Sequence, residues 1–180
     1  DQYGGSLENR ARFGVEIVEA VRAAGGEDFA IVLRFSQWKQ QDYEARLAET
    51  PEELERFLTL FTDAGVDVFH ASTRRFWTPE FEGSDLNLAG WTRKLTGKPV
   101  ISVGSVGLDD DFIGANNQGI GGNANPKGIE DLAKRMAADE FDLIAVGRAL
   151  LQDPNWLVKM RDGQHDEIEP FTKAALGSLS

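Results

Sequence analysis

The sequence has no cysteine, few cations and no long apolar run, and each absence excludes a class of function. Without cysteine the chain can form no disulfide or iron–sulfur cluster, and it offers neither a thiolate zinc ligand nor a cysteine nucleophile. Its 19 Lys and Arg residues are outnumbered by 30 Asp and Glu residues, which gives a net charge of −11. Because nucleic acids and anionic membranes are held by clustered cations, we expect neither as a partner.

The longest apolar stretches, such as Phe29 to Leu33, have the length of a β-strand. They fall far short of the ~20 residues that a membrane helix needs. We therefore expect a cytoplasmic protein. The 180 residues, 41% of them hydrophobic, suffice for one core and hence one domain. The first residue is Asp1 and not methionine, so we expect the chain to be a piece of a longer protein.

Four nearly continuous apolar runs alternate with amphipathic segments. The runs predict buried parallel strands over residues 29–34, 66–71, 99–104 and 141–147. The segments between and around them predict helices over about residues 6–24, 50–65, 86–95, 129–136 and 154–161. We expect Ser6 and Thr50 to be N-caps, with Glu53 reaching back to complete a capping box at the second helix.

The strand starts at 29, 66, 99 and 142 are separated by 37, 33 and 43 residues. These separations are close to the roughly 31 residues per βα unit of a TIM barrel, of which four units make half. An open doubly wound sheet would give the same alternation. The first strand is followed by Arg34-Phe35-Ser36-Gln37 and so lacks a glycine fingerprint, which disfavours the open dinucleotide-binding fold.

In a parallel α/β sheet the ligand lies beyond the carboxyl ends of the strands. Two glycines stand there, Gly104 before Ser105 and Gly147 before Arg148. Glycine lets the backbone approach a phosphate oxygen, the following N–H groups can donate to it, and Arg148 would add a fixed charge. We therefore predict a phosphate site here. The alternative is that both glycines are only tight strand exits.

Arg34 and His70 are the other candidates at the strand ends. An unpaired guanidinium after an apolar strand is costly to bury, so we expect Arg34 to meet an anion. That anion is either a structural carboxylate, such as Glu53 or Asp67, or the negative charge of a reduced flavin. His70 is the candidate acid–base group, with a structural role as the alternative. We expect His165 to lie at the surface.

Three aromatic residues fall in loops: Trp38, Phe76 and Trp77. They are candidates either to line a pocket for a flat ligand or to seal the loops onto the barrel rim. The glycine-rich stretch 114–128 follows no strand directly and is expected to be a surface loop. We interpret Asp109 to Asp111 as a solvated helix start and expect no metal site.

The opening residues carry a motif, namely Asp1, Tyr3, Gly4, Gly5, Ser6, Glu8, Asn9, Arg10, Arg12 and Phe13. The motif resembles a signature of the Old Yellow Enzyme family of FMN-dependent NAD(P)H oxidoreductases. Further segments resemble the family in the same order: 33–36, 103–105, 146–148, Asp153-Pro154 and Lys159. The resemblance implies that residues 1–180 are the C-terminal half, strands 5 to 8, of a single TIM-barrel domain.

The resemblance also implies FMN as cofactor, NAD(P)H as hydride donor, and reduction of activated alkenes such as enones. By position, Arg34 would lie near the flavin N1 and O2 edge. The phosphate binders would be Gly104, Ser105, Gly147 and Arg148. The sequence departs from the family at Gln37, where proline is usual, and at Ser105, where a second glycine is common. The family's substrate-anchoring residues and its tyrosine proton donor would precede the opening motif, so no catalytic residue is assigned here.

Two other functions fit the same residues. One is a non-catalytic half-barrel that binds a phosphate-bearing ligand or assembles with a second copy. The other is a phosphate-binding TIM-barrel lyase or isomerase. In each case we expect a small-molecule ligand. A half-barrel has open edges and an apolar face, so we expect either a missing N-terminal half or a second copy to cover it.

Overall fold

The computed structural model describes residues 1–108 and 126–177, in which helices and strands alternate. The strands are β1 (Val32–Phe35), β2 (Val68–Ser72), β3 (Val100–Val103) and β4 (Leu143–Ala145). The helices are α1 (Leu7–Gly25), α2 (Pro51–Asp63), α3 (Leu88–Thr96), α5 (Pro126–Ala137), α6 (Arg148–Gln152) and α7 (Trp156–Arg161), with 3₁₀ helices η1 (His165–Glu167) and η2 (Lys173–Leu176). No helix within these two ranges is long and apolar enough to cross a membrane.

The four strands form one parallel sheet in the order β1-β2-β3-β4, which confirms the predicted parallel strands. The strands are shorter than the apolar runs, and near two strand starts a carboxylate accepts a hydrogen bond from a backbone N–H. β1 begins only after Ile31, whose N–H donates to Asp67 Oδ2 at 2.8 Å. β4 begins only after Asp142, whose Oδ2 accepts from the N–H of Val100 at 2.8 Å.

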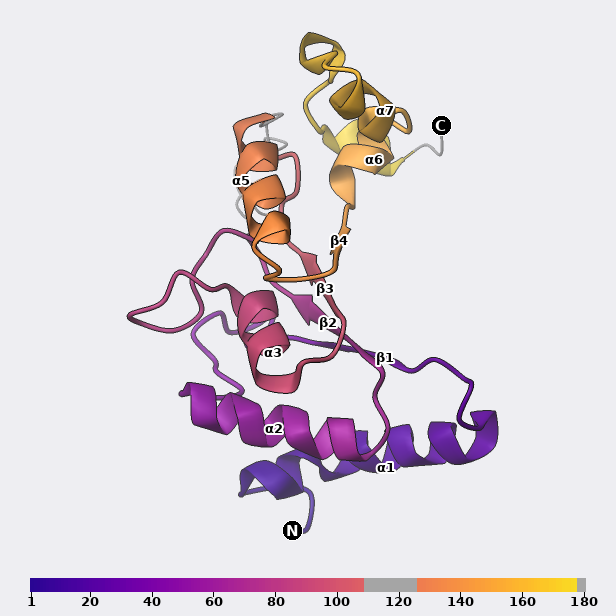
Figure 1. The fold of residues 1–180 in the computed structure, drawn as a ribbon, viewed down its shortest axis with the longest axis vertical. Helices are drawn as coiled ribbons and strands as arrows, with labels where there is room; N and C mark the ends of the chain where they lie inside the picture. The colour runs from indigo at the N-terminus through magenta and orange to yellow at the C-terminus, as the bar shows by residue number, and fades with distance from the viewer. Residues whose placement is uncertain (109–125, 178–180) are drawn as a thin grey trace.

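Side chains alternate between the two faces of the sheet, and the helices cover one of them. On the covered face Phe35 is buried, with its ring centroid 6.1 Å from that of Phe69 and 5.9 Å from that of Phe57 in α2. Figure 1 shows α1, α2, α3 and α5 on this side of the sheet. On the other face Val32 and Leu143 are 51% and 58% exposed. The sheet therefore presents apolar side chains on the face that these helices leave open.

Both predicted N-caps are present. Ser6 Oγ accepts from the N–H of Asn9 at 3.2 Å, and Thr50 Oγ1 accepts from the N–H of Glu53 at 3.2 Å. The capping box closes one residue earlier than predicted, because the Glu53 carboxylate accepts from the N–H of Glu49 at 2.8 Å. Each side chain satisfies backbone donors that the first turn of a helix leaves unpaired.

The segment after β4 differs from the prediction of one helix over 154–161. The structure has α6 as well as α7, with a corner at Asp153 between them. Asp153 Oδ1 accepts from the N–H of Asn155 at 2.9 Å, and Oδ2 accepts from Lys159 Nζ at 2.7 Å. The Asp153-Pro154 and Lys159 pattern is therefore a structural feature that fixes the turn between the two helices.

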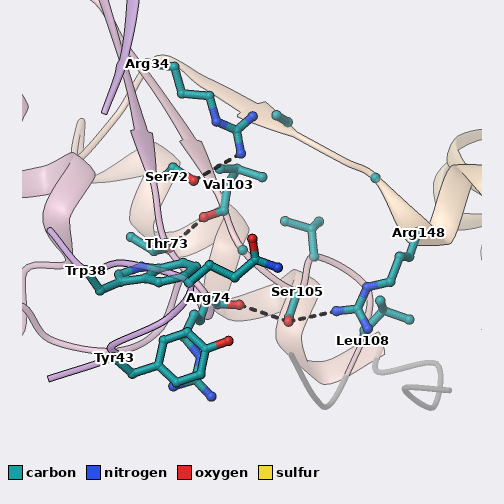
Figure 2. A pocket seen from close by; sticks show the side chains of 15 residues that line it. Arg34, Trp38, Tyr43, Ser72, Thr73, Arg74, Val103, Ser105, Leu108 and Arg148 are labelled. Carbon is teal, nitrogen blue, oxygen red and sulfur yellow. Dashed lines mark hydrogen bonds between the residues drawn. The ribbon is translucent and has the colours of Figure 1, made fainter. Parts of the chain in front are cut away.

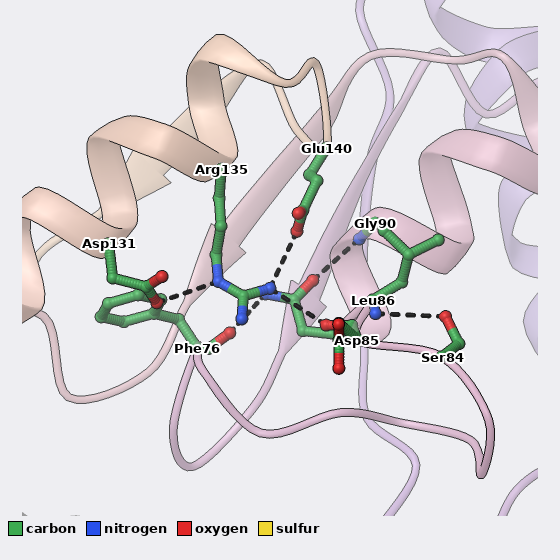
Figure 3. Close-up of polar contacts among 9 residues, drawn as sticks. Phe76, Ser84, Asp85, Leu86, Gly90, Asp131, Arg135 and Glu140 are labelled. Atoms are coloured by element: carbon green, nitrogen blue, oxygen red, sulfur yellow. Dashed lines mark hydrogen bonds and ion pairs between the residues drawn. The ribbon is translucent and has the colours of Figure 1, made fainter.

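Arg135 of α5 ties that helix to the loop that precedes α3 (Figure 3). Its guanidinium donates to Asp131 and to Glu140, both at 3.0 Å, and to the carbonyl of Asp85 at 3.1 Å. In the same loop buried Asn87 donates to the carbonyl of Phe76 at 2.6 Å and caps α3. These contacts fix the long loop after β2.

The stretches 109–111 and 114–125 lie outside the described residues, and α5 begins at the end of the glycine-rich stretch.

Arg22 and Asp67 stabilise the turn that connects α1 to β1. Arg22 Nη2 lies 2.6 Å from Asp67 Oδ2, and Nη1 donates to the carbonyl of Phe29 at 2.7 Å. The pKa of Asp67 is lowered, first by the Ile31 N–H that it accepts and then by Arg22. A carboxylate with a lowered pKa stabilises the fold above its unfolded-state pKa, and the contribution is lost as pH falls through the folded-state pKa.

Asp67→Asn should lower the free energy of unfolding of the intact protein by about 1 kcal/mol at pH 7, a modest value because the pair is partly exposed. The difference from the unmutated protein should shrink as the pH is lowered into the acid range. Denaturant unfolding at several pH values measures both effects. Asp28→Asn, an exposed aspartate in the same turn, is the matched control. A difference that does not vary with pH would contradict this role for Asp67.

Candidate functional site

A cavity of about 350 Å³ lies at the carboxyl ends of the strands (Figure 2). All five residues that the sequence predicted as binders line it: Arg34, Gly104, Ser105, Gly147 and Arg148. The parallel register brings them together, because strand ends that are far apart in the sequence meet at one edge of the sheet. The other lining residues are Trp38, Gln40, Tyr43, Ser72, Thr73, Arg74, Val103, Val106, Leu108 and Ala145.

Arg148 is held at the wall of this cavity by Ser105. Its Nη2 donates to Ser105 Oγ at 3.2 Å, and Ser105 Oγ donates to the carbonyl of Arg74 at 3.0 Å. The ring of Phe171 lies 5.7 Å from the guanidinium carbon. Ser105 has a φ of 49°, in the left-handed region where glycine is usual. The two hydrogen bonds of its hydroxyl group help a serine occupy the position where the family commonly has a second glycine.

The two glycines have different roles in the structure. Gly104 has a φ of 149°, and a Cβ there would lie 2.7 Å from Thr73 Oγ1 and 2.9 Å from the backbone nitrogen of Phe76. Gly104 is therefore required as a tight strand exit. At Gly147 no atom of the described residues, apart from its two chain neighbours, lies within 4 Å of the position of a Cβ. The backbone of Gly147, which carries no side chain, borders open space beside Arg148. This open space would allow a phosphate to approach the backbone closely.

The structure corrects the expected surroundings of Arg34. Its side chain is exposed on the open face of the sheet, so burial does not force it against an anion. Nη2 donates to Ser72 Oγ at 3.0 Å. Neither suggested carboxylate is its partner, since Asp67 binds Arg22 and Glu53 accepts from Glu49. The guanidinium borders the cavity, on a different side from Arg148 (Figure 2).

His70 pairs with Arg34 across the β1–β2 ladder and is not among the described residues that line the cavity. Burial, and then the charge of Arg34, lower the pKa of His70. The imidazole is therefore neutral at neutral pH. Its Nε2 is buried without a hydrogen-bond partner among the described residues. His165 is exposed in η1, as predicted.

The loop aromatics divide between the two predicted roles. Trp38 lines the cavity. Phe76 is fully buried, and Trp77 packs edge-on against it with ring centroids 5.1 Å apart, so this pair seals the loop. Tyr43 was not among the predicted site residues, but it also lines the cavity and lies edge-on to Trp38, with ring centroids 5.1 Å apart. Tyr43 lies in a polar segment without periodicity. The only sequence signal for a role in the site was an aromatic residue in a loop near the end of a strand.

Gln37 fixes the loop that carries Trp38 and Tyr43. Its side chain is buried, with Nε2 donating to the carbonyl of Ala48 at 3.0 Å and Oε1 accepting from the N–H of Ala48 at 2.9 Å. The backbone carbonyl of Gln37 also accepts from the N–H of Leu47 at 2.9 Å. Gln37, which stands where the family usually has proline, is thus the residue that closes this loop.

Gly104→Ala should destabilise the protein by about 3 kcal/mol, because the methyl group would overlap backbone atoms at a positive φ. Gly147→Ala should change stability by less than about 1 kcal/mol, since its methyl group would enter open space. Thermal or denaturant unfolding of the two ligand-free variants measures the contrast. Equal losses of stability in the two variants would contradict the different roles that the structure gives to the two glycines.

Several known proteins are similar in sequence to this chain. It is 31% identical over 187 residues to a protein named NADH oxidase from Thermoanaerobacter brockii, covering 99% of this chain and 25% of that protein. It is 25% identical over 198 residues to a protein named cinnamate reductase from Clostridium sporogenes, covering 99% of this chain and 27% of that protein. The chain therefore spans only about a quarter of the length of these two relatives.

Solved structures show the same fold at low sequence identity. Morphinone reductase in complex with tetrahydroNAD matches with a TM-score of 0.60 at 19% identity, over 100% of this chain and 43% of that one. These structural neighbours are TIM-barrel enzymes of the Old Yellow Enzyme type. A family model described as NADH:flavin oxidoreductase / NADH oxidase matches residues 1–125. The chain belongs to this family of FMN-dependent oxidoreductases, as its opening motif indicated.

Proposed function

We propose that this chain is the FMN-binding half of an NAD(P)H-dependent oxidoreductase that reduces activated alkenes, such as enones. The observation that carries the proposal is the cavity at the strand ends. It presents the Arg148–Ser105 pair and the bare backbone of Gly147 at one side, and Arg34 at another. Family membership favours this function over a phosphate-binding lyase or isomerase.

The phosphate of FMN would bind at the Arg148 side. Arg148 is held by Ser105 and would donate charge-assisted hydrogen bonds to the phosphate oxygens. Gly147 would let them reach the backbone because it has no Cβ to exclude them. α6 has only five residues, so the cation and local N–H groups, and not a long helix dipole, would supply the attraction.

The flavin ring would extend from the phosphate toward Arg34. A cation near the N1 and O2 edge stabilises the negative charge of the reduced ring, which is one of the few ways in which a protein tunes this cofactor. When bound, FMN accepts a hydride from NAD(P)H and passes it to the alkene. Trp38 borders the same cavity and would exclude water there. The proton that completes alkene reduction is assigned to no residue of this chain.

We further propose that the sheet is strands 5 to 8 of a TIM barrel whose other half lies outside residues 1–180. Two observations support this: the open face bears exposed Val32 and Leu143, and the relatives are much longer than the chain. In a closed barrel these side chains would face the interior and be covered. The enzyme's small-molecule substrate would then bind above a rim that both halves complete.

Gly147→Asp should abolish FMN binding in the intact enzyme, because a carboxylate would fill the open space and repel the phosphate. Arg148→Ala should weaken binding by about 1.5 to 3 kcal/mol, the value of a charge-assisted contact. Titration of the apoprotein with FMN, followed by flavin fluorescence, measures both. Arg161→Ala removes an exposed arginine from α7 and should leave affinity unchanged. Unaltered affinity in both site variants would refute the phosphate assignment.

Residues 1–180 produced alone should self-associate and should not reduce an enone, because the apolar face and sheet edges stay uncovered. The intact enzyme should be yellow and should reduce the same enone with NAD(P)H. Light scattering, a thermal melt and an activity assay on both proteins make the comparison. A monomeric, cooperatively melting and active 180-residue chain would overturn the half-barrel proposal.

A further inference from the structure

An aromatic ring from the last part of the chain packs beside Arg148. Phe171 is only 4% exposed, and the centroid of its ring lies 5.7 Å from the guanidinium carbon of Arg148, within cation–π range. Among the described residues, Phe171 is not part of the contiguous hydrophobic core that the sheet and the helices form. The ring is therefore buried outside the main core, beside a residue that lines the cavity.

Gln152 holds the segment 169–172 against α6. Its Oε1 accepts from the N–H of Thr172 at 2.9 Å and from the Thr172 hydroxyl group at 3.3 Å. Its Nε2 donates to a carboxylate oxygen of Glu169 at 3.4 Å. Arg148 and Gln152 are the first and last residues of α6, and residues four apart lie on the same face of a helix. The segment therefore contacts α6 at both ends of one face.

Arg148 is thus contacted by residues of two other segments. Its Nη2 donates to Ser105 Oγ at 3.2 Å, and the ring of Phe171 lies beside its guanidinium group. An arginine side chain loses conformational freedom when it binds a ligand, and a side chain that is already ordered loses less. An aromatic ring also excludes water from the cation beside it, which strengthens the attraction between that cation and an anion. Both effects favour the binding of an anion by Arg148.

We propose that Phe171 is a positioning residue for the phosphate of FMN. It acts through Arg148, whose guanidinium group it orders beside Ser105 and the open backbone of Gly147. The phosphate would contact Arg148 and Gly147, and not the ring. The segment 169–172 would thereby belong to the cofactor site, although it lies far along the sequence from Ser105. The inference rests on the proposed function.

The test compares FMN with riboflavin, which is the same molecule without the phosphate. Each is titrated into the apoprotein of the intact enzyme, and flavin fluorescence reports binding. The unmutated protein should bind FMN more tightly. Phe171→Leu keeps an apolar side chain but removes the ring. It should weaken FMN binding about 3- to 10-fold, as expected when a cation loses an aromatic contact, and riboflavin binding by less than about 2-fold.

Further variants separate the ring, its position and its route of action. Phe171→Tyr keeps an aromatic ring and should keep most of the preference for FMN. Leu176→Ala removes an exposed apolar side chain from η2 and should leave both affinities unchanged. Phe171→Leu should add little to the loss in Arg148→Met, because the ring acts through Arg148. Should Phe171→Leu fail to fold, Gln152→Ala decides the question, since it releases the segment and should also lower the ratio of FMN to riboflavin affinity.

The outcomes distinguish this inference from the proposed function. An unmutated apoprotein that binds FMN and riboflavin equally would refute the phosphate site, and with it this inference. A protein that prefers FMN, and keeps the full preference in Phe171→Leu and Gln152→Ala, would refute the role of Phe171 alone. So would equal losses of FMN and riboflavin affinity in Phe171→Leu, because a residue that acts on the phosphate cannot weaken riboflavin binding. Additive losses in the double variant would contradict action through Arg148.

Discussion

The close contact between the loop after β2 and the end of β3 is the constraint on which the cavity depends. Thr73 Oγ1 donates to the carbonyl of Val103 at 2.5 Å, and the N–H of Phe76 donates to the carbonyl of Gly104 at 3.1 Å. Only glycine fits at 104, because a side chain would meet these backbone atoms. The contact places the carbonyl of Arg74 where the Ser105 hydroxyl reaches it, and Ser105 in turn receives Arg148.

Charge is distributed unevenly between the cavity and the rest of the molecule. The chain is strongly acidic, yet the cavity at the strand ends is bordered by arginines and by no carboxylate of the described residues. The acidic groups are engaged elsewhere, for example Asp67 with Arg22 and Glu140 with Arg135. A cationic cavity in an acidic protein attracts anions locally without making the whole surface attractive to nucleic acid.

The sequence predicted the elements that depend on local patterns and missed the contacts that depend on loop shape. Strand order and N-caps follow from apolar runs and from residues such as Ser6 and Thr50, whose side chains act within one turn. The grouping of strand-end residues follows from parallel topology. Gln37 and Tyr43 could not be ranked, because their partners, Ala48 and Arg74, are set by the path of an irregular loop. Neither carboxylate suggested for Arg34 is its partner, and the sequence did not show that Arg34 lies on the uncovered face of β1.

The order of the strands in the sheet also bears on how the chain assembles. Each strand pairs with the next one along the sequence, so every pairing closes a loop of a single βα unit. The entropy lost on closing a loop rises only slowly with its length, and local pairings form faster than distant ones. The sheet can therefore grow one strand at a time as the polypeptide leaves the ribosome. Its outer strands, β1 and β4, each keep one edge of backbone N–H and carbonyl groups that further strands can pair with.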